Sequence, residues 1–231
     1  MKRFLRFLFP ALALGILIFV WSVSISNNGG IAATFQTTSI SILVYNLFKL
    51  AGLTAFTLVA LQVLTGPYMH LWEKLYGPKF YRYHGYQGIF ALLFALTHWF
   101  LITWYLKLIH VGVLQFDRNN FPLPEFITFY FGPLALVIML VTVTTAALSV
   151  LWDKPWFQKV WRKLHYANYL IFILVYLHSR KVGTDVGPLN SPLHFLWDVF
   201  LLGTIGGLIY RHVYVPHRHG PVQNSNVAKI S

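Results

Sequence analysis

The sequence predicts an all-α integral membrane protein: a bundle of six transmembrane helices with both termini in the cytoplasm. Three observations support this class. The 231 residues are 57% hydrophobic and only 10% charged, whereas a soluble domain carries about 25% charged residues. Six apolar stretches approach the roughly 20 residues that a spanning helix needs. Basic residues gather in alternate connecting segments, as the positive-inside rule requires.

The six predicted spans lie at about 7–24, 42–65, 85–107, 130–151, 164–180 and 195–211. Basic residues precede the first span, which is also the pattern of a signal peptide. No small-residue cleavage site follows it, so we predict an uncleaved helix. The last span contains Gly203, Gly206 and Gly207, small residues that let neighbouring helices approach closely.

The charge distribution predicts orientation and location. Most Lys and Arg residues lie in the N-terminus, in segments 66–84 and 152–163, and in the tail, which the positive-inside rule places in the cytoplasm. We therefore predict a multi-pass protein of the cell membrane (inner or plasma membrane) in contact with lipid. The 18 basic residues exceed the 6 acidic ones, but they form short clusters between apolar runs, so we predict no nucleic-acid partner.

The sequence contains no cysteine and 10 histidines. This composition excludes disulfides, thiolate metal sites, iron–sulfur clusters, covalently attached haem and thiolate-ligated haem. Any redox metal in this chain must therefore be held by histidine.

Four histidines predict two metal-binding levels inside the membrane. His84 and His98 lie fourteen residues apart on the third span, and His165 and His178 lie thirteen apart on the fifth. These spans run in parallel, and a rise of about 1.5 Å per residue separates the histidines of each span by about 20 Å. His84 therefore pairs in depth with His165, and His98 with His178. On an ideal helix His178 would point about 140° away from His165, so tilt, a bulge or the reach of the imidazole must absorb the difference.

Ionisable residues inside a membrane are costly and usually functional. Four histidines matched in depth therefore predict two b-type haems, with His84 and His165 ligating one iron and His98 and His178 the other. The alternative for any one of them is a histidine that bonds a neighbouring helix or lines a polar cavity.

Several cations lie where the propionates of such haems would emerge: Arg82, Arg162, Lys163, Arg180 and Lys181. We take Arg82, Lys163 and Arg180 as the candidate cofactor-binding cations. Their alternative role is to set the topology or to meet lipid phosphates. Near the outer end of the last span, His194 and Asp198 form an i, i+4 pair, which is either a proton or acceptor site or a local polar contact.

Two motifs carry a family resemblance. One is YHGYQG at 83–88, continuing to THW at 97–99; the other is WRKLHY at 161–166, continuing to YLH at 176–178. With these residues the sequence resembles the ferric reductase-like transmembrane domain over roughly 45–212. That family includes ferric-chelate reductases, superoxide-producing NADPH oxidases and the haem membrane subunit of the bacterial methionine sulfoxide reductase system. The spacings of fourteen and thirteen match its bis-haem pattern.

The resemblance implies a transmembrane domain over 1–212 and a cytoplasmic tail over 213–231. The tail is similar to the approach to the flavin domain with which relatives often continue, so FAD or FMN is expected on a partner or on a domain missing from this sequence. Ile102 stands where the oxidases carry a histidine four residues beyond the outer ligand, which weakens a superoxide-producing role. The methionine sulfoxide reductase subunit often lacks the first inner ligand, which His84 supplies here.

The four paired histidines and the family resemblance together predict a di-haem b-type membrane cytochrome, either an oxidoreductase or its electron-transfer subunit. It would take electrons from a cytosolic reduced flavin or nicotinamide-linked donor, such as a flavoprotein, and pass them to an outer acceptor such as a ferric chelate. One alternative is a haem subunit that delivers electrons to a periplasmic reductase such as methionine sulfoxide reductase. Alternatives of other classes are a His-rich proton or metal transporter and a purely structural membrane protein.

Overall fold

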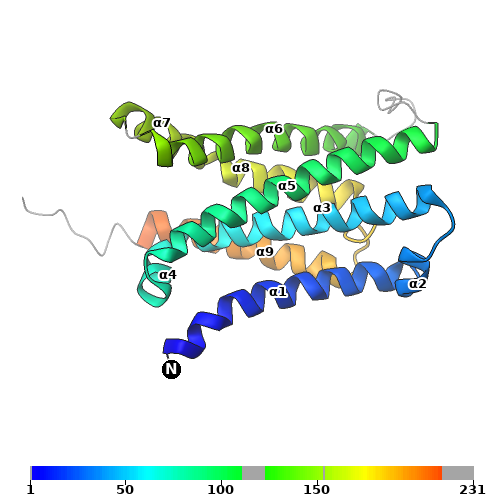
Figure 1. The fold of residues 1–231 in the computed structure, drawn as a ribbon, viewed down its shortest axis with the longest axis horizontal. Coiled ribbons are helices and arrows are strands. Elements are labelled where there is room, and N and C mark those ends of the chain that lie inside the picture. Colours follow the sequence, from blue (N-terminus) through cyan, green and yellow to red (C-terminus); the bar gives the residue numbers. More distant parts are fainter. Residues whose placement is uncertain (1, 111–122, 153, 215–231) are drawn as a thin grey trace, which may run out of the picture.

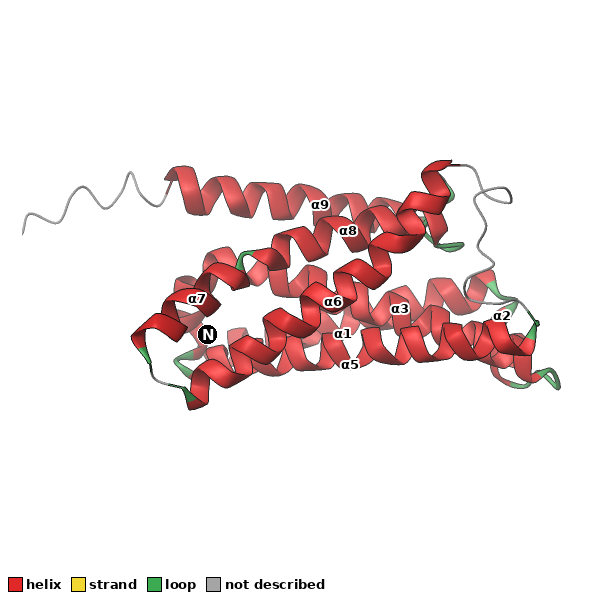
Figure 2. Cartoon of the chain, turned by 90° about the horizontal axis from the view of Figure 1, so that it is seen from above, coloured by secondary structure: helices red, strands yellow, loops and turns green. Residues whose placement is uncertain are grey.

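A computed structural model describes residues 2–110, 123–152 and 154–214, and every regular element in these ranges is helical (Figures 1 and 2). The all-α prediction is confirmed. The elements in chain order are α1 (Lys2–Asn27), α2 (Gly30–Phe35), α3 (Ile40–Thr65), η1 (Gly66–Tyr68), α4 (Met69–Tyr76), α5 (Lys79–Leu108), α6 (Leu123–Leu151), α7 (Pro155–His165), α8 (Ala167–Val182), α9 (Pro192–Ile209) and η2 (Tyr210–Tyr214). Nearly all of the predicted tail, residues 215–231, lies outside the described residues.

Five described helical segments are long and apolar enough to cross a membrane. They are Phe9–Asn27, Ile40–Tyr76, Lys79–Leu108, Ile127–Ser149 and Pro192–Val213. Each overlaps one of the predicted spans, so the multi-pass membrane architecture is confirmed.

The remaining predicted span, 164–180, is divided between two helices. α7 ends at His165, and α8 has 16 residues, about 24 Å of helix, which is shorter than the roughly 20 residues of a typical span. The count of six spans and the cytoplasmic location of both termini therefore stay predictions. Figure 1 shows the start of α1 and the end of α9 at the end of the bundle that holds α4 and α7. We call this the His84 end and the opposite end, near α2, the His98 end.

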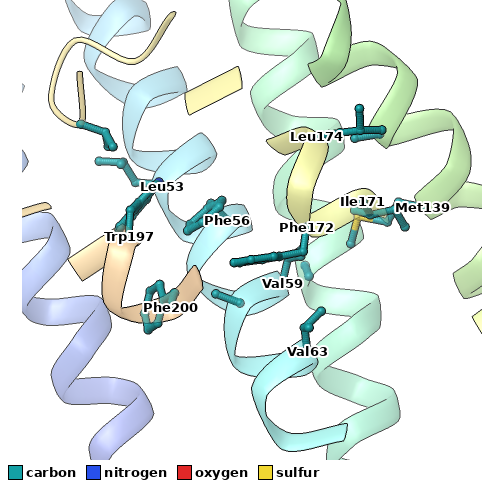
Figure 3. Packing of buried hydrophobic residues seen from close by; sticks show 14 of the residues in the cluster. Leu53, Phe56, Val59, Val63, Met139, Ile171, Phe172, Leu174, Trp197 and Phe200 are labelled. Carbon is teal, nitrogen blue, oxygen red and sulfur yellow. The ribbon is translucent and has the colours of Figure 1, made fainter. Parts of the chain in front are cut away.

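α3 is the central helix of the bundle. Fourteen of its 26 residues are buried, against five of the 30 residues of α5. Figure 3 shows Phe56 of α3 between Trp197 of α9 and Phe172 of α8. The rings of Phe56 and Trp197 stack with centroids 4.3 Å apart. α3 therefore joins α9 to the helices that carry the histidines.

Two of the glycines in α9 allow the close packing that the sequence predicts. A Cβ atom on Gly203 would lie 2.7 Å from Leu64 Cδ2, and one on Gly207 would lie 3.0 Å from Pro67 Cγ, whereas Gly206 has no such neighbour within 4 Å. Gly203 and Gly207 thus face α3 and η1, and Gly206 faces away from them.

α1 is fastened to α3 by a hydrogen bond in the middle of the bundle. Trp21 Nε1 donates to Thr54 Oγ1 at 2.8 Å. Near the His84 end, the ring of Phe9 packs on Trp72 and Phe80 with centroids 5.1 and 5.6 Å away. α1 is therefore held by specific side chains as well as by its apolar surface.

Candidate functional site

At the His84 end the structure brings the first predicted histidine pair together. His84 lies in the second turn of α5, and His165 is the last residue of α7. Their ring centroids are 6.2 Å apart, and the ring planes are inclined by 61°. Helices from two distant parts of the sequence thus present two imidazoles to one another.

Each of these rings has a polar neighbour at Nδ1. His84 Nδ1 lies 3.4 Å from Thr65 Oγ1, whose own hydroxyl hydrogen is donated to Leu61 O at 2.9 Å. The Thr65 hydroxyl oxygen can therefore accept a hydrogen bond from His84 Nδ1. His165 Nδ1 lies 3.1 Å from the Asn168 amide, which can present either its nitrogen or, after a half-turn, its oxygen.

At the His98 end two imidazoles line one cavity of about 320 Å³ between α3, α5, α6 and α8. His98 Nδ1 is 2.7 Å from the carbonyl oxygen of Phe48, and His178 Nδ1 is 2.9 Å from that of Thr128. Both bonds join residues that are fifty positions apart. A carbonyl only accepts, so Nδ1 of each ring carries the hydrogen and Nε2 of the neutral ring keeps its lone pair.

A break between α7 and α8 lies between the two histidines of the fifth predicted span. α5 runs without interruption through His84 and His98, whereas His165 ends α7 and His178 lies in α8. At the break, Tyr166 N donates to Lys163 O and Tyr169 N donates to Tyr166 O. These i to i+3 bonds wind the chain more tightly than an α-helix. The chain between His165 and His178 is therefore not one regular α-helix, and the rotation expected for an ideal helix does not apply to it.

The cavity also holds a buried ion pair that the sequence analysis missed. Among the described residues that line the cavity, Lys49 and Asp185 are those with a formal charge at neutral pH. Lys49 Nζ lies 3.1 Å from Asp185 Oδ2, and the two side chains are 10% and 5% exposed. Ser24 Oγ donates to Asp185 at 2.6 Å, Asn27 Nδ2 donates to it at 3.4 Å, and Lys49 donates to Asn28 Oδ1 at 3.1 Å. We call these five residues the Lys49–Asp185 network.

The sequence did contain a signal for this network. A lysine inside a predicted span is costly and predicts a buried partner. With only 6 acidic residues in the chain, the choice of partner was small, but the spacing did not identify Asp185.

The predicted cations fall into two groups. Arg82 and Lys163 are exposed at the His84 end. Arg180 is not among the residues that line the cavity; its Nη2 lies 3.7 Å from Asp198 Oδ1, its guanidinium lies over the Tyr176 ring, and its Nη1 is buried without a hydrogen-bond partner. The propionate role of all three stays a prediction.

The predicted His194–Asp198 pair belongs to the same network as Arg180. His194 Nε2 lies 3.8 Å from Asp198 Oδ2, and His194 Nδ1 donates to Val186 O at 3.0 Å. Asp198 also accepts from the Tyr176 hydroxyl at 2.7 Å. Every partner here comes from α8, α9 or the segment between them, so these contacts connect neighbouring helices.

Comparison with known proteins assigns the family. A protein-family model described as the ferric reductase like transmembrane component matches residues 51–176, more than half of the chain. The matched region includes His84, His98 and His165 and ends two residues before His178. A search of curated proteins and a search of solved structures found no match. The match, in a chain with several helices apolar enough to cross a membrane, shows that this chain belongs to the ferric reductase-like transmembrane component family.

Proposed function

We propose that this chain is a di-haem b-type cytochrome that passes electrons across the membrane. The donor would be a reduced flavin or a nicotinamide-linked partner in the cytoplasm, and the acceptor an outer compound such as a ferric chelate. The observation that carries the proposal is the pairing of four imidazoles at two levels, His84 with His165 and His98 with His178. Membership of the family supports it, because ferric reductase-like domains generally bind haem.

The donor atoms at the His98 end fit a metal held between two histidines. A ligating histidine usually donates its other ring N–H to a carbonyl or carboxylate, which fixes the tautomer and the ring orientation. The bonds from His98 and His178 to the Phe48 and Thr128 carbonyls follow this rule. They leave the Nε2 lone pair of each ring for iron.

The separation at the His84 end fits as well. A histidine nitrogen lies about 2 Å from a bound transition metal, so two imidazoles on opposite sides of one ion hold their centroids about 6 Å apart. The separation of 6.2 Å between His84 and His165 agrees with this arrangement.

Each haem, when bound, would supply a one-electron redox centre whose potential depends on its axial ligands and surroundings. His98 and His178 would hold the haem at the His98 end, and His84 and His165 the haem at the His84 end. Each electron delivered to an outer ferric chelate would reduce one ferric ion to ferrous. Movement of that charge out of a negative interior is favoured by about 2.3 kcal/mol per 100 mV.

The deciding experiment is a count of haem per chain. Protein purified from haem-sufficient cells should show a Soret band, a reduced-minus-oxidised spectrum of b type and two haems per chain in the pyridine haemochrome assay. His98→Ala and His84→Ala should each retain one haem, because each removes one ligand pair. His110→Ala, an exposed histidine after α5, is the matched control and should retain both. Colourless wild-type protein would contradict the proposal and favour a transporter or a structural role.

The direction of transfer needs a second measurement. Protein in sealed vesicles with reductant trapped inside should reduce an external ferric chelate, detected with a dye that binds ferrous iron and does not cross the membrane. Haem-loaded protein that reduces no chelate but transfers electrons to a bound reductase would support the alternative role as an electron-delivering subunit.

A further inference from the structure

Two glycines face the imidazole rings at the His98 end in the same way. Gly52 lies one helical turn after Phe48 in α3, and Gly132 lies one turn after Thr128 in α6. Each ring at this end is therefore bonded to a backbone carbonyl and lies against the glycine one turn further along the same helix. The hairpin of α3 with α5 and the hairpin of α6 with α8 thus repeat one local arrangement.

Both glycines are too close to the rings to carry a side chain. A Cβ atom on Gly52 would lie 2.8 Å from Nδ1 and 2.9 Å from Cε1 of His98. A Cβ atom on Gly132 would lie 3.0 to 3.2 Å from three ring atoms of His178. Favourable contacts between heavy atoms are about 3.5–4.0 Å, so a methyl group at either position would push against the ring, and more strongly at position 52.

Backbone conformation does not explain these glycines. Both lie inside α-helices, and neither has a positive φ. Alanine would favour the helix by about 1 kcal/mol at each position. The space beside the ring is therefore the property for which glycine is needed. Among the glycines in the described part of the chain, these are the two whose added Cβ would meet an imidazole.

We propose that Gly52 and Gly132 are positioning residues that fix the orientation of the His98 and His178 rings. Rotation of a histidine ring about χ2 is only weakly restricted by the side chain itself. The hydrogen bond from Nδ1 to the carbonyl fixes one atom of the ring. Close contact with the glycine backbone restricts rotation of the ring about this hydrogen bond. The two rings are then oriented before any ligand binds, as a precise metal site requires. The nature of the ligand rests on the proposed function; the ring orientation does not.

Gly52→Ala and Gly132→Ala test this proposal, with Gly206→Ala as the matched control, since an added Cβ at that helical glycine meets no atom within 4 Å. In holoprotein the readouts are haem per chain and the electron paramagnetic resonance signal of each oxidised centre. We expect Gly52→Ala to lose the centre at the His98 end, leaving one haem, or to shift its signal. Gly132→Ala should keep two haems and show a smaller shift of the same signal. Both variants should leave the signal from the His84 end unchanged, and the control should match the wild type.

A measurement on haem-free protein separates this proposal from the proposed function. In protein labelled with ¹⁵N-histidine, the Nδ1 proton of His98 that is bonded to Phe48 O should give a resonance protected from exchange with water, and Gly52→Ala should remove it. Wild-type resonances and signals in both alanine variants would overturn the positioning role even if haem binds. If Gly52→Ala does not fold, Gly132→Ala decides, and an unshifted His178 resonance and metal signal in that variant would overturn it equally. Wild-type protein that binds no haem when haem is supplied would instead overturn the proposed function.

Discussion

Removing Lys49 alone from the buried ion pair should destabilise the protein more than removing both charges. Lys49→Met leaves the Asp185 carboxylate buried at 5% exposure, with Ser24 and Asn27 still donating to it. Breaking a buried pair by deleting one partner costs about 3–5 kcal/mol, and we expect about 3 because those two donors remain. Asp185→Asn should cost about 2 kcal/mol, since the amide oxygen can still accept from Lys49.

The double variant Lys49→Met/Asp185→Asn contains no unpaired charge. It should cost about 2 kcal/mol, well below the sum of the two single changes, which implies a coupling of about 3 kcal/mol between the two sites. Reversible unfolding in mixed micelles, followed by tryptophan fluorescence and far-ultraviolet circular dichroism, gives the four free energies of unfolding. Lys107→Met, at an exposed lysine in the last turn of α5, is the control and should change the free energy by less than about 0.5 kcal/mol. Additive single changes, or a Lys49→Met variant as stable as the control, would refute the reasoning.

Three further predictions concern contacts between helices and use the same unfolding measurement. Trp197→Ala should lower the free energy of unfolding by about 3–5 kcal/mol, because this fully buried ring would leave a large cavity; a loss below about 1 kcal/mol would contradict its place in the core. Trp21→Phe should cost about 1 kcal/mol by removing the bond to Thr54, and Thr54→Val combined with it should add little. Gly207→Ala should cost about 1–3 kcal/mol, since the added Cβ would meet a rigid proline ring. Gly206→Ala, whose Cβ meets no atom, should cause no loss of stability. Equal effects at the two positions would show that α9 packs differently.

Much of the architecture could be predicted from the sequence because lipid imposes a simple rule. A chain that crosses a bilayer must bond its backbone internally and be apolar over a fixed length. Runs such as 42–65 and 85–107 therefore identified helices close to those observed. The depth of each histidine followed from the same regular rise per residue.

Rotation about the helix axis was harder to predict than depth. The spacing between His165 and His178 conflicted with one continuous helix, but the sequence did not show where the conflict would be relieved. The break at Tyr166 depends on a few i to i+3 hydrogen bonds, which carry no clear composition signal. The short α8 that follows is also the reason why the predicted span at 164–180 does not appear as one long helix.

Contacts between distant helices could not be predicted from spacing alone. In the sequence, Gly52 and Gly132 look like ordinary small residues of a membrane helix. Their contacts with the rings of His98 and His178 depend on how α3 packs against α5 and α6 against α8. Arg180 shows the converse: its position in the sequence suggested a ligand contact, but its nearest anion is Asp198 on the adjacent helix.

Lys49 and Asp185 lie 136 positions apart in the sequence, which has a consequence for how the protein is made. A chain emerging from the ribosome delivers α3 to the bilayer long before residue 185 has been synthesised. During that interval the ammonium group of Lys49 lacks its Asp185 partner, and its long side chain favours a position toward the lipid headgroups. The final packing of α1 against α3 therefore requires the segment after α8. A nascent chain halted before residue 185 should remain sensitive to proteases in the connection between α1 and α3.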